Sequence, residues 1–103
     1  MKVIFTTVTP DKASAIVKEL LENRLIGCGN IIPKARSFYW WKGNIQDDEE
    51  AVIFMETTDE LISEAIEHLN KIHPYDVPKI LSWEPSDAIP AYVQWLNSET
   101  INR

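Results

Sequence analysis

One stretch of this sequence is longer than a compact domain of the same chain could hold. The run from Asn30 to Lys42 has the pattern of a single strand, is rich in aromatic residues and is interrupted once by Pro33. Fully extended, it would span roughly 43 Å at about 3.3 Å per residue. A compact domain of this length has a diameter of only about 33 Å. The strand must therefore bend at Pro33 or project beyond its own domain. A projecting aromatic strand needs cover, which we expect a second copy of the chain to supply.

The bulk composition limits the class of protein. The chain has 103 residues, of which 45% are hydrophobic and 25% are charged, as in an ordinary globular domain. Its formal net charge of −6 disfavours a nucleic-acid partner, because phosphate binding needs a clustered basic surface. A single cysteine excludes an internal disulfide, and no apolar run has the length of a secretory signal or a membrane span. We therefore expect one cytoplasmic domain over residues 1–103, with no membrane and no nucleic-acid partner.

Hydrophobic periodicity predicts the elements up to the turn of the long hairpin. A continuous apolar and β-branched run over residues 3–8 indicates a central strand. From Pro10 to about Arg24, apolar residues recur every three or four positions, which indicates an amphipathic helix. After the long strand, Lys42 and Gly43 form a turn, so we expect an antiparallel hairpin.

The returning strand of the hairpin is expected to begin near Glu49 and to end at Met55. A capping box with Thr57 as the cap and Glu60 three residues later then opens a second helix. Pro74 ends this helix, because the residue before a proline is disfavoured in helical conformation.

A short strand over Lys79–Trp83 and a terminal helix over Ala88–Leu96, starting properly at Pro90, complete the chain. The order β-α-β-β-α-β with a C-terminal helix predicts an α+β, ferredoxin-like (split β-α-β) sandwich. Both main helices then cover one face of the antiparallel sheet and leave the other face bare. Because a soluble monomer does not tolerate a large bare apolar face, we expect self-association with closed symmetry.

Cys28 is the first candidate for chemistry. It lies between two glycines and could serve as a metal ligand or as a reactive thiol. The alternative is a small buried apolar side chain at a tight backbone position. No second cysteine is present, which excludes a tetrahedral thiolate zinc site within one chain.

His73 is the second candidate, because it opens the sequence His-Pro-Tyr-Asp at the end of the second helix. Its imidazole could bind a metal together with Asp76 or with an acidic group of another chain. The alternative is a histidine that caps the helix while Tyr75 packs. His68 lies about 140° around the helix from His73, so the two are poorly placed to share an ion, and we expect His68 to be solvated. The acidic run 47–50 could bind a hard cation, but we expect it to be a solvated turn.

The aromatic residues of the long strand form the third candidate group. Strand alternation places Tyr39 and Trp41 on one face and Trp40 on the other. They could stack on an aromatic ligand, or they could pack between chains, as aromatic side chains with a polar atom often do. No nucleophile elbow, phosphate loop or catalytic triad has a supporting context, so we do not expect an enzyme.

A set of short motifs runs the length of the chain in a specific order and spacing. It comprises Leu25-Ile26-Gly27-Cys28, Asn30-Ile31-Ile32-Pro33, Ser37, Tyr39, Trp41, Gly43, Ile45, Glu50, Thr57, His73-Pro74-Tyr75, Val77-Pro78, Ile80, Tyr92 and Trp95. In these residues the chain resembles the CutA family of divalent-cation tolerance proteins. The resemblance implies a ferredoxin-like subunit, a tight homotrimer assembled through the long hairpin, a cytoplasmic location, and a role in tolerance of copper and other divalent ions.

The resemblance also implies where a ligand would bind. We expect a weak site for copper or another divalent cation in the cleft between subunits, near Cys28 and His73, with Tyr39, Trp41 and Tyr75 as its walls. No cofactor is required. The alternative is a trimeric small-molecule sensor or scaffold without a metal role, by analogy with the PII signalling proteins.

Two departures from the family pattern lead to further expectations. Some bacterial members have a cysteine where this chain has Thr7 and a second histidine where it has Ile72, so copper binding should be weak here. Glu56 and Lys79 replace a lysine and an acidic residue, respectively. Their reversed signs predict an ion pair between adjacent strands.

Overall fold

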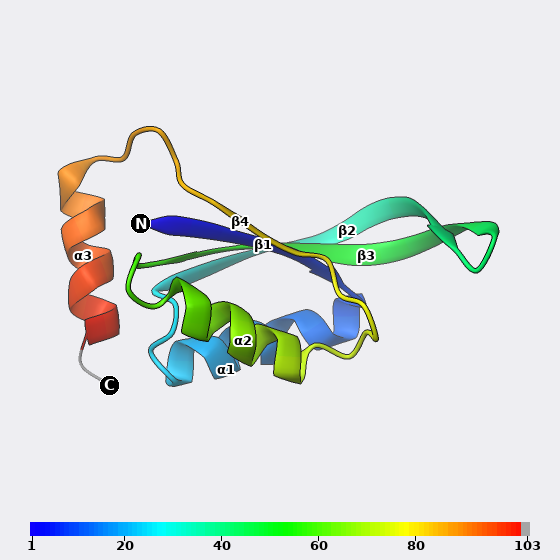
Figure 1. Ribbon diagram of the computed structural model, residues 1–103, viewed down its shortest axis with the longest axis horizontal. Coiled ribbons are helices and arrows are strands. Elements are labelled where there is room, and N and C mark those ends of the chain that lie inside the picture. Colours follow the sequence, from blue (N-terminus) through cyan, green and yellow to red (C-terminus); the bar gives the residue numbers. More distant parts are fainter. Residues whose placement is uncertain (102–103) are drawn as a thin grey trace.

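The computed structural model describes residues 1–101, which form a four-stranded sheet with two helices on one face and a third helix at one end (Figure 1). The strands are β1 (Lys2–Val8), β2 (Cys28–Trp41), β3 (Asn44–Thr57) and β4 (Ile80–Trp83). The helices are α1 (Ala13–Glu22), α2 (Ile62–Ile72) and α3 (Pro90–Ile101). The strand order is β2-β3-β1-β4, and each neighbouring pair is antiparallel. The predicted α+β, β-α-β-β-α-β fold with a terminal helix is confirmed.

The β2–β3 hairpin extends well beyond the two helices that cover the sheet (Figure 1). The molecule measures 45 × 26 × 21 Å along its principal axes, and the hairpin tip and α3 lie at the two ends of the long one (Figure 1). At its tip Lys42 and Gly43 have φ angles of 50° and 83°, which suit the turn of a two-residue hairpin. β3 begins at Asn44 rather than near Glu49. Apart from Ile45, its first residues are polar. This part of the hairpin packs on no helix, so a strand here needs no apolar alternation.

β2 changes register at Pro33, as the proline suggested. Ile32 pairs with Val52 and Ala35 pairs with Glu50, so two residues of β2 face one residue of β3. This bulge also reverses which positions of β2 share a face. Before it, even-numbered residues such as Ile32 lie on the face opposite the helices. After it, the odd-numbered residues from Ala35 onward lie there.

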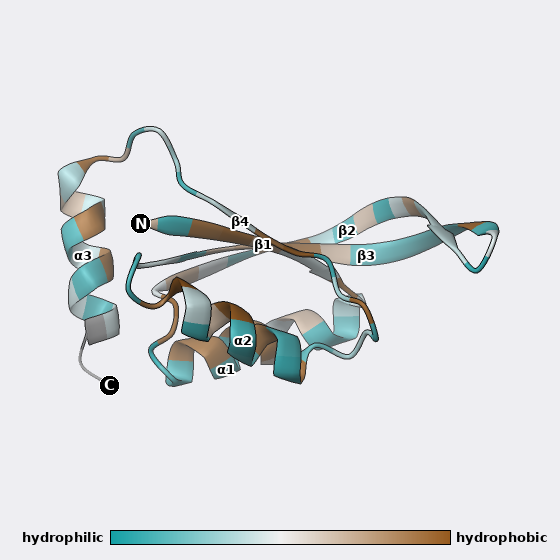
Figure 2. Cartoon of the chain, viewed as in Figure 1, coloured by the Kyte–Doolittle hydropathy of each residue, from teal (hydrophilic) through white to brown (hydrophobic). Residues whose placement is uncertain are grey.

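The hydrophobic core lies between the sheet and the helices α1 and α2. Ile4 and Ile53 of the sheet and Leu20 and Leu69 of the helices have no exposed surface. Hydrophobic residues continue through β1 and along the two helices (Figure 2). α1 is preceded by a 3-10 turn, Pro10–Lys12.

The opposite face of the sheet is uncovered, as predicted. Phe5, Phe54 and Trp83 form an aromatic cluster there, with ring centroids 5.2 Å apart for the two phenylalanines and 6.4 Å apart for Phe54 and Trp83. Leu81 and Ile32 on the same face are about half exposed. α3 packs at the end of the sheet (Figure 1). Within residues 1–101, no helix combines the length and hydrophobicity needed to cross a membrane.

Three local predictions are wrong. Thr57 does not cap α2. Its hydroxyl instead donates a 2.6 Å hydrogen bond to the Leu25 carbonyl inside the protein, and Thr58 Oγ1 accepts the Leu61 N–H. His68 is not simply solvated, since its Nε2 lies 2.6 Å from a carboxylate oxygen of Glu19 and joins α2 to α1. The terminal helix continues beyond Leu96.

The predicted Glu56–Lys79 ion pair is also wrong. Glu56 lies on β3 opposite Val3, whereas Lys79 precedes β4, and β1 separates these two strands. The register displaces the two residues by about four positions along the strands, which is about 13 Å. Glu56 instead accepts a hydrogen bond from Tyr92, and Lys79 Nζ lies 5.3 Å from the centre of the Phe5 ring.

Candidate functional site

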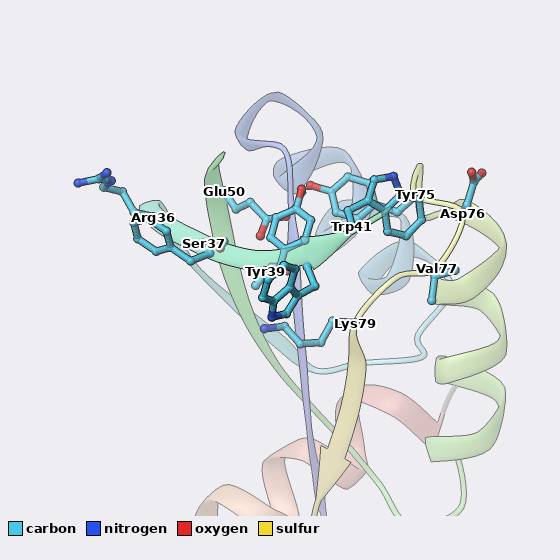
Figure 3. Close-up of a pocket in the computed structure, with 12 residues that line it drawn as sticks. Arg36, Ser37, Tyr39, Trp41, Glu50, Tyr75, Asp76, Val77 and Lys79 are labelled. Carbon is cyan, nitrogen blue, oxygen red and sulfur yellow. Dashed lines mark hydrogen bonds between the residues drawn. The ribbon is translucent and has the colours of Figure 1, made fainter. Parts of the chain in front are cut away.

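A groove with a volume of about 720 Å³ lies where the hairpin leaves the body of the sheet. Its walls come from the second half of β2, from β3, and from the connection between α2 and β4, which passes the end of β1 (Figures 1 and 3). It is lined by Thr7, Arg36, Ser37, Phe38, Tyr39, Trp40, Trp41, Glu50, Tyr75, Asp76, Val77 and Lys79. The size is typical of a site for a small molecule.

Two tyrosine–carboxylate pairs line or border this groove. The Tyr75 hydroxyl donates a 2.6 Å hydrogen bond to Glu50 Oε2, and the Tyr39 hydroxyl donates to Asp48 Oδ2. Burial, followed by the Glu50 carboxylate, raises the pKa of Tyr75. The hydrogen bond to Asp48 is the largest cause of the raised pKa of Tyr39. Both phenols therefore keep their protons near neutral pH and act as donors. Figure 3 shows the two phenol groups directed toward each other.

His73 lies behind Tyr75 and is buried. Its Nε2 is 2.9 Å from the Thr7 carbonyl oxygen, which can only accept, so the ring carries its proton on Nε2. Its Nδ1 accepts the backbone N–H of Tyr75 at 3.2 Å. Burial lowers the pKa of His73, which keeps the ring neutral. Both nitrogens thus hold the α2–β4 connection on β1 and position Tyr75, whose ring centre is 4.7 Å away.

Cys28 lies at the other end of the sheet. It pairs with Glu56, whose carboxylate accepts a 2.7 Å hydrogen bond from the Tyr92 hydroxyl. Burial, and then the charge of Glu56, raise the pKa of the Cys28 thiol, so the thiol is protonated at neutral pH. Thr7, the partner of His73, lies about four residues along the strands from the level of Cys28, or about 13 Å.

The structure therefore divides the candidate residues named from the sequence. Tyr39, Trp41 and Tyr75 line one groove, and His73 lies directly behind it. Cys28 is remote from His73 within one chain, and residues 1–101 contain no cluster of three or more histidine, cysteine or acidic side chains suited to a metal ion.

Sequence reasoning missed the acidic side of the groove. The run 47–50 was expected to be a solvated turn, but Glu50 is only 6% exposed. Strand alternation places Asp48 and Glu50 on one face of β3 and their neighbours Asp47 and Glu49 on the other, but it does not indicate that Glu50 is buried. Lys79 also lines the groove, although the sequence pairs it only with Glu56.

Comparison with known proteins assigns the family. A family model described as CutA1 divalent ion tolerance protein matches residues 1–99. The divalent-cation tolerance protein CutA of Pyrococcus horikoshii is 41% identical over 102 residues, which cover 97% of this chain and 98% of the relative. The corresponding protein of Thermotoga maritima is 40% identical over 91 residues, covering 88% and 89% of the two chains.

Solved structures agree with this assignment. The divalent ion tolerance protein CutA1 from Ehrlichia chaffeensis superposes with a TM-score of 0.92 at 37% identity and covers 96% of this chain and 94% of its own. The PII-like protein CutA from Nostoc sp. PCC 7120 has a TM-score of 0.92 at 24% identity over 97% of both chains, which shows a shared fold. The chain belongs to the CutA1 family of divalent ion tolerance proteins.

Proposed function

We propose that this chain acts in divalent-ion tolerance in the cytoplasm as a homotrimer, in which the groove becomes part of a cleft between subunits that binds a divalent cation or another small ligand weakly. The observation that carries the proposal is the uncovered aromatic face of the sheet. Phe5, Phe54 and Trp83 lie on it in contact with one another, and Leu81 is 51% exposed. Burying such a face stabilises an assembly by about 25 cal/mol per Å² of apolar surface.

The sheet topology supports a ring rather than a pair. The two edge strands, β2 and β4, are different segments, and each presents unpaired backbone groups. If β2 of one copy meets β4 of the next, the contact is heterologous, and heterologous contacts form a ring such as a trimer when the rotation between copies closes. The number of subunits in the ring, three, comes from the resemblance to the CutA family.

The donor chemistry supports weak rather than tight metal binding. The Cys28 thiol is protonated, and both nitrogens of His73 are already hydrogen-bonded within the chain. These two donors could meet only across a subunit interface. The oxygen donors of Glu50 and Asp48 are better suited to a hard divalent cation than to copper.

Two measurements test the proposal. Light scattering in dilute solution should give three times the chain mass of 11.9 kDa, and a lone chain would contradict the assembly. Isothermal titration with copper and zinc on the assembled protein should give heat that His73→Ala reduces. His68→Ala is the matched control, since it removes a histidine that pairs with Glu19 away from the groove. No heat at millimolar protein, or heat unaffected by His73→Ala, would remove His73 from the site.

A second candidate is a small-molecule sensor or scaffold without a metal role. It is favoured by the groove volume and aromatic walls, together with the fold shared with the PII-like protein from Nostoc. A ligand specific for the folded state raises the melting temperature, so a thermal-shift screen with nucleotides tests this function. No catalytic role is proposed, because the named relatives are tolerance proteins.

A further inference from the structure

The acidic side chains of the groove have no basic partner in the described part of the chain. Glu50 is almost fully buried, and its known partner is the Tyr75 hydroxyl, a neutral donor. Asp48 likewise accepts from Tyr39, and the ion pairs formed within residues 1–101 include neither Glu50, Asp48 nor Asp76. Asp48 and Asp76 are exposed, so of these carboxylates only that of Glu50 is removed from water. A buried carboxylate without a countercharge is costly, so the groove favours a positively charged ligand beside Glu50.

The basic residues near the groove are engaged elsewhere. Arg36 forms an ion pair with Asp47 at 2.7 Å, and both lie on the hairpin face that Glu50 does not share. The Lys79 ammonium lies 5.3 Å from the centre of the Phe5 ring, which holds it by a cation–π contact. His73 is neutral because it is buried, so it supplies no countercharge either.

The remaining wall is aromatic. Tyr39, Trp41 and Tyr75 all line the groove, and Figure 3 shows the two tyrosines next to Glu50 and Trp41 on the far side of Tyr75. The faces of aromatic rings attract ammonium groups within about 6 Å, and tryptophan does so best. The Lys42 ammonium lies 6.0 Å from the Trp41 ring centre, so this ring already contacts a cation of the chain, which a bound ammonium ion would have to displace or join.

From these features we propose that the groove binds a small organic ammonium ion, with the charged group near Glu50 and the carbon body against Trp41 and Tyr39. The Glu50 carboxylate, which has no basic partner, would repel an anion. A bare metal ion would make no contact with the aromatic rings of the groove. The proposal identifies the class of small ligand for the site of the proposed function. The ammonium proposal rests on the proposed function only because both use the same groove. It does not require the trimer, since the residues involved belong to one chain.

The first test compares three probes of nearly equal shape by titration calorimetry on the assembled protein. They are 2-phenylethylammonium, the neutral 2-phenylethanol and the anionic phenylacetate. We expect the ammonium to saturate the site and the other two to bind at least about tenfold more weakly, the size expected when a charge-assisted hydrogen bond is lost. Equal binding of the three, tighter binding of phenylacetate, or no saturation by the ammonium would overturn the proposal.

The second test uses Glu50→Gln, which removes the charge but keeps an oxygen that can accept from Tyr75. It should weaken ammonium binding about tenfold. Trp41→Leu should weaken it by several-fold through the lost cation–π contact. Glu49→Gln is the matched control on the opposite face of β3 and should leave binding unchanged. Equal affinities of the Glu50 and Glu49 variants would overturn the proposal.

The two proposals fail in different ways. A trimer that binds no ammonium ion contradicts this inference alone. A monomer that still binds 2-phenylethylammonium, with loss in Glu50→Gln, contradicts the trimer and supports the ligand class. Circular dichroism of each variant confirms that a loss of binding does not come from unfolding.

Discussion

Replacing Gly29 with alanine tests how closely α1 packs on β2. An alanine Cβ at this position would lie 2.6 Å from Val17 Cγ1 and 3.2 Å from Val17 Cγ2. Valine on a helix has one strongly preferred χ1 rotamer, so rotating its side chain away from the added methyl group is itself costly. The substitution must therefore move α1 away from the sheet.

Forcing an extra methyl group into a packed core costs about 1–3 kcal/mol. Alanine also restricts the unfolded chain more than glycine, which offsets about 0.4–1 kcal/mol of that cost. We expect Gly29→Ala to lower the free energy of unfolding by about 1–2 kcal/mol. Urea unfolding followed by circular dichroism measures this loss. The chain concentration must be fixed, since the stability of an oligomer depends on it.

Combining Gly29→Ala with Val17→Ala identifies the cause. If the clash is responsible, removing the valine methyls relieves it, and the two substitutions together should cost about 1 kcal/mol less than the sum of their separate effects. Gly43→Ala is the control, because an added Cβ there meets nothing within 4 Å and strains only a backbone with φ of 83°. Its cost should be unaffected by Val17→Ala. A fully stable Gly29→Ala variant, or strict additivity with Val17→Ala, would refute the packing argument.

Three further substitutions test other parts of the structure. Trp83→Glu places a charge on the uncovered sheet face and should shift the mass in light scattering toward 11.9 kDa, whereas an unchanged mass would exclude this face from the interface. Thr57→Val leaves the buried carbonyl of Leu25 unpaired and should lower the free energy of unfolding by about 1–3 kcal/mol in urea, and no loss would mean that water replaces the hydroxyl. The lowered pKa of His73 means that the unfolded chain binds a proton that the folded chain resists, so the wild type should lose stability as the pH falls below about 6.5. His73→Gln should lose less over that window in urea unfolding from pH 7 to 5, and equal slopes would show that His73 is not the cause.

The order of elements could be predicted from the sequence because each element that packs in the core carries its own periodicity. The helices α1 and α2 show an apolar stripe, and β1 shows a continuous apolar run, so their existence followed directly. The start of β3 could not be predicted in this way, because residues 44–48 pair with β2 beyond the helices. Neither side of the strand faces the core there, so the sequence shows no apolar alternation. The role of Thr57 was also misassigned. Whether a threonine caps a helix or bonds to a distant carbonyl depends on tertiary packing.

The candidate site could be predicted only in part. Alternation correctly placed Tyr39 and Trp41 on one face of β2, and the structure adds Tyr75 from a connection remote in sequence. Glu50 was missed because its burial comes from that connection rather than from its own strand. Cys28 and His73 were considered together because of the residue types. Their positions at different ends of the sheet follow from the strand register, which a single sequence does not contain.

The bulge at Pro33 joins the uncovered face and the groove into one surface. Ile31 pairs with the buried Ile53, so without the bulge Tyr39 and Trp41 would continue on the helix side of the sheet. The proline has no N–H for the β2–β3 ladder, and it therefore stabilises the interruption that turns these rings to the other side. The same turn places them beside Glu50, on the face that we propose to be buried between copies of the chain. Because the groove and the proposed interface share this surface, a ligand that binds the assembly more tightly than the single chain would also stabilise the assembly, and occupancy would then be coupled to association.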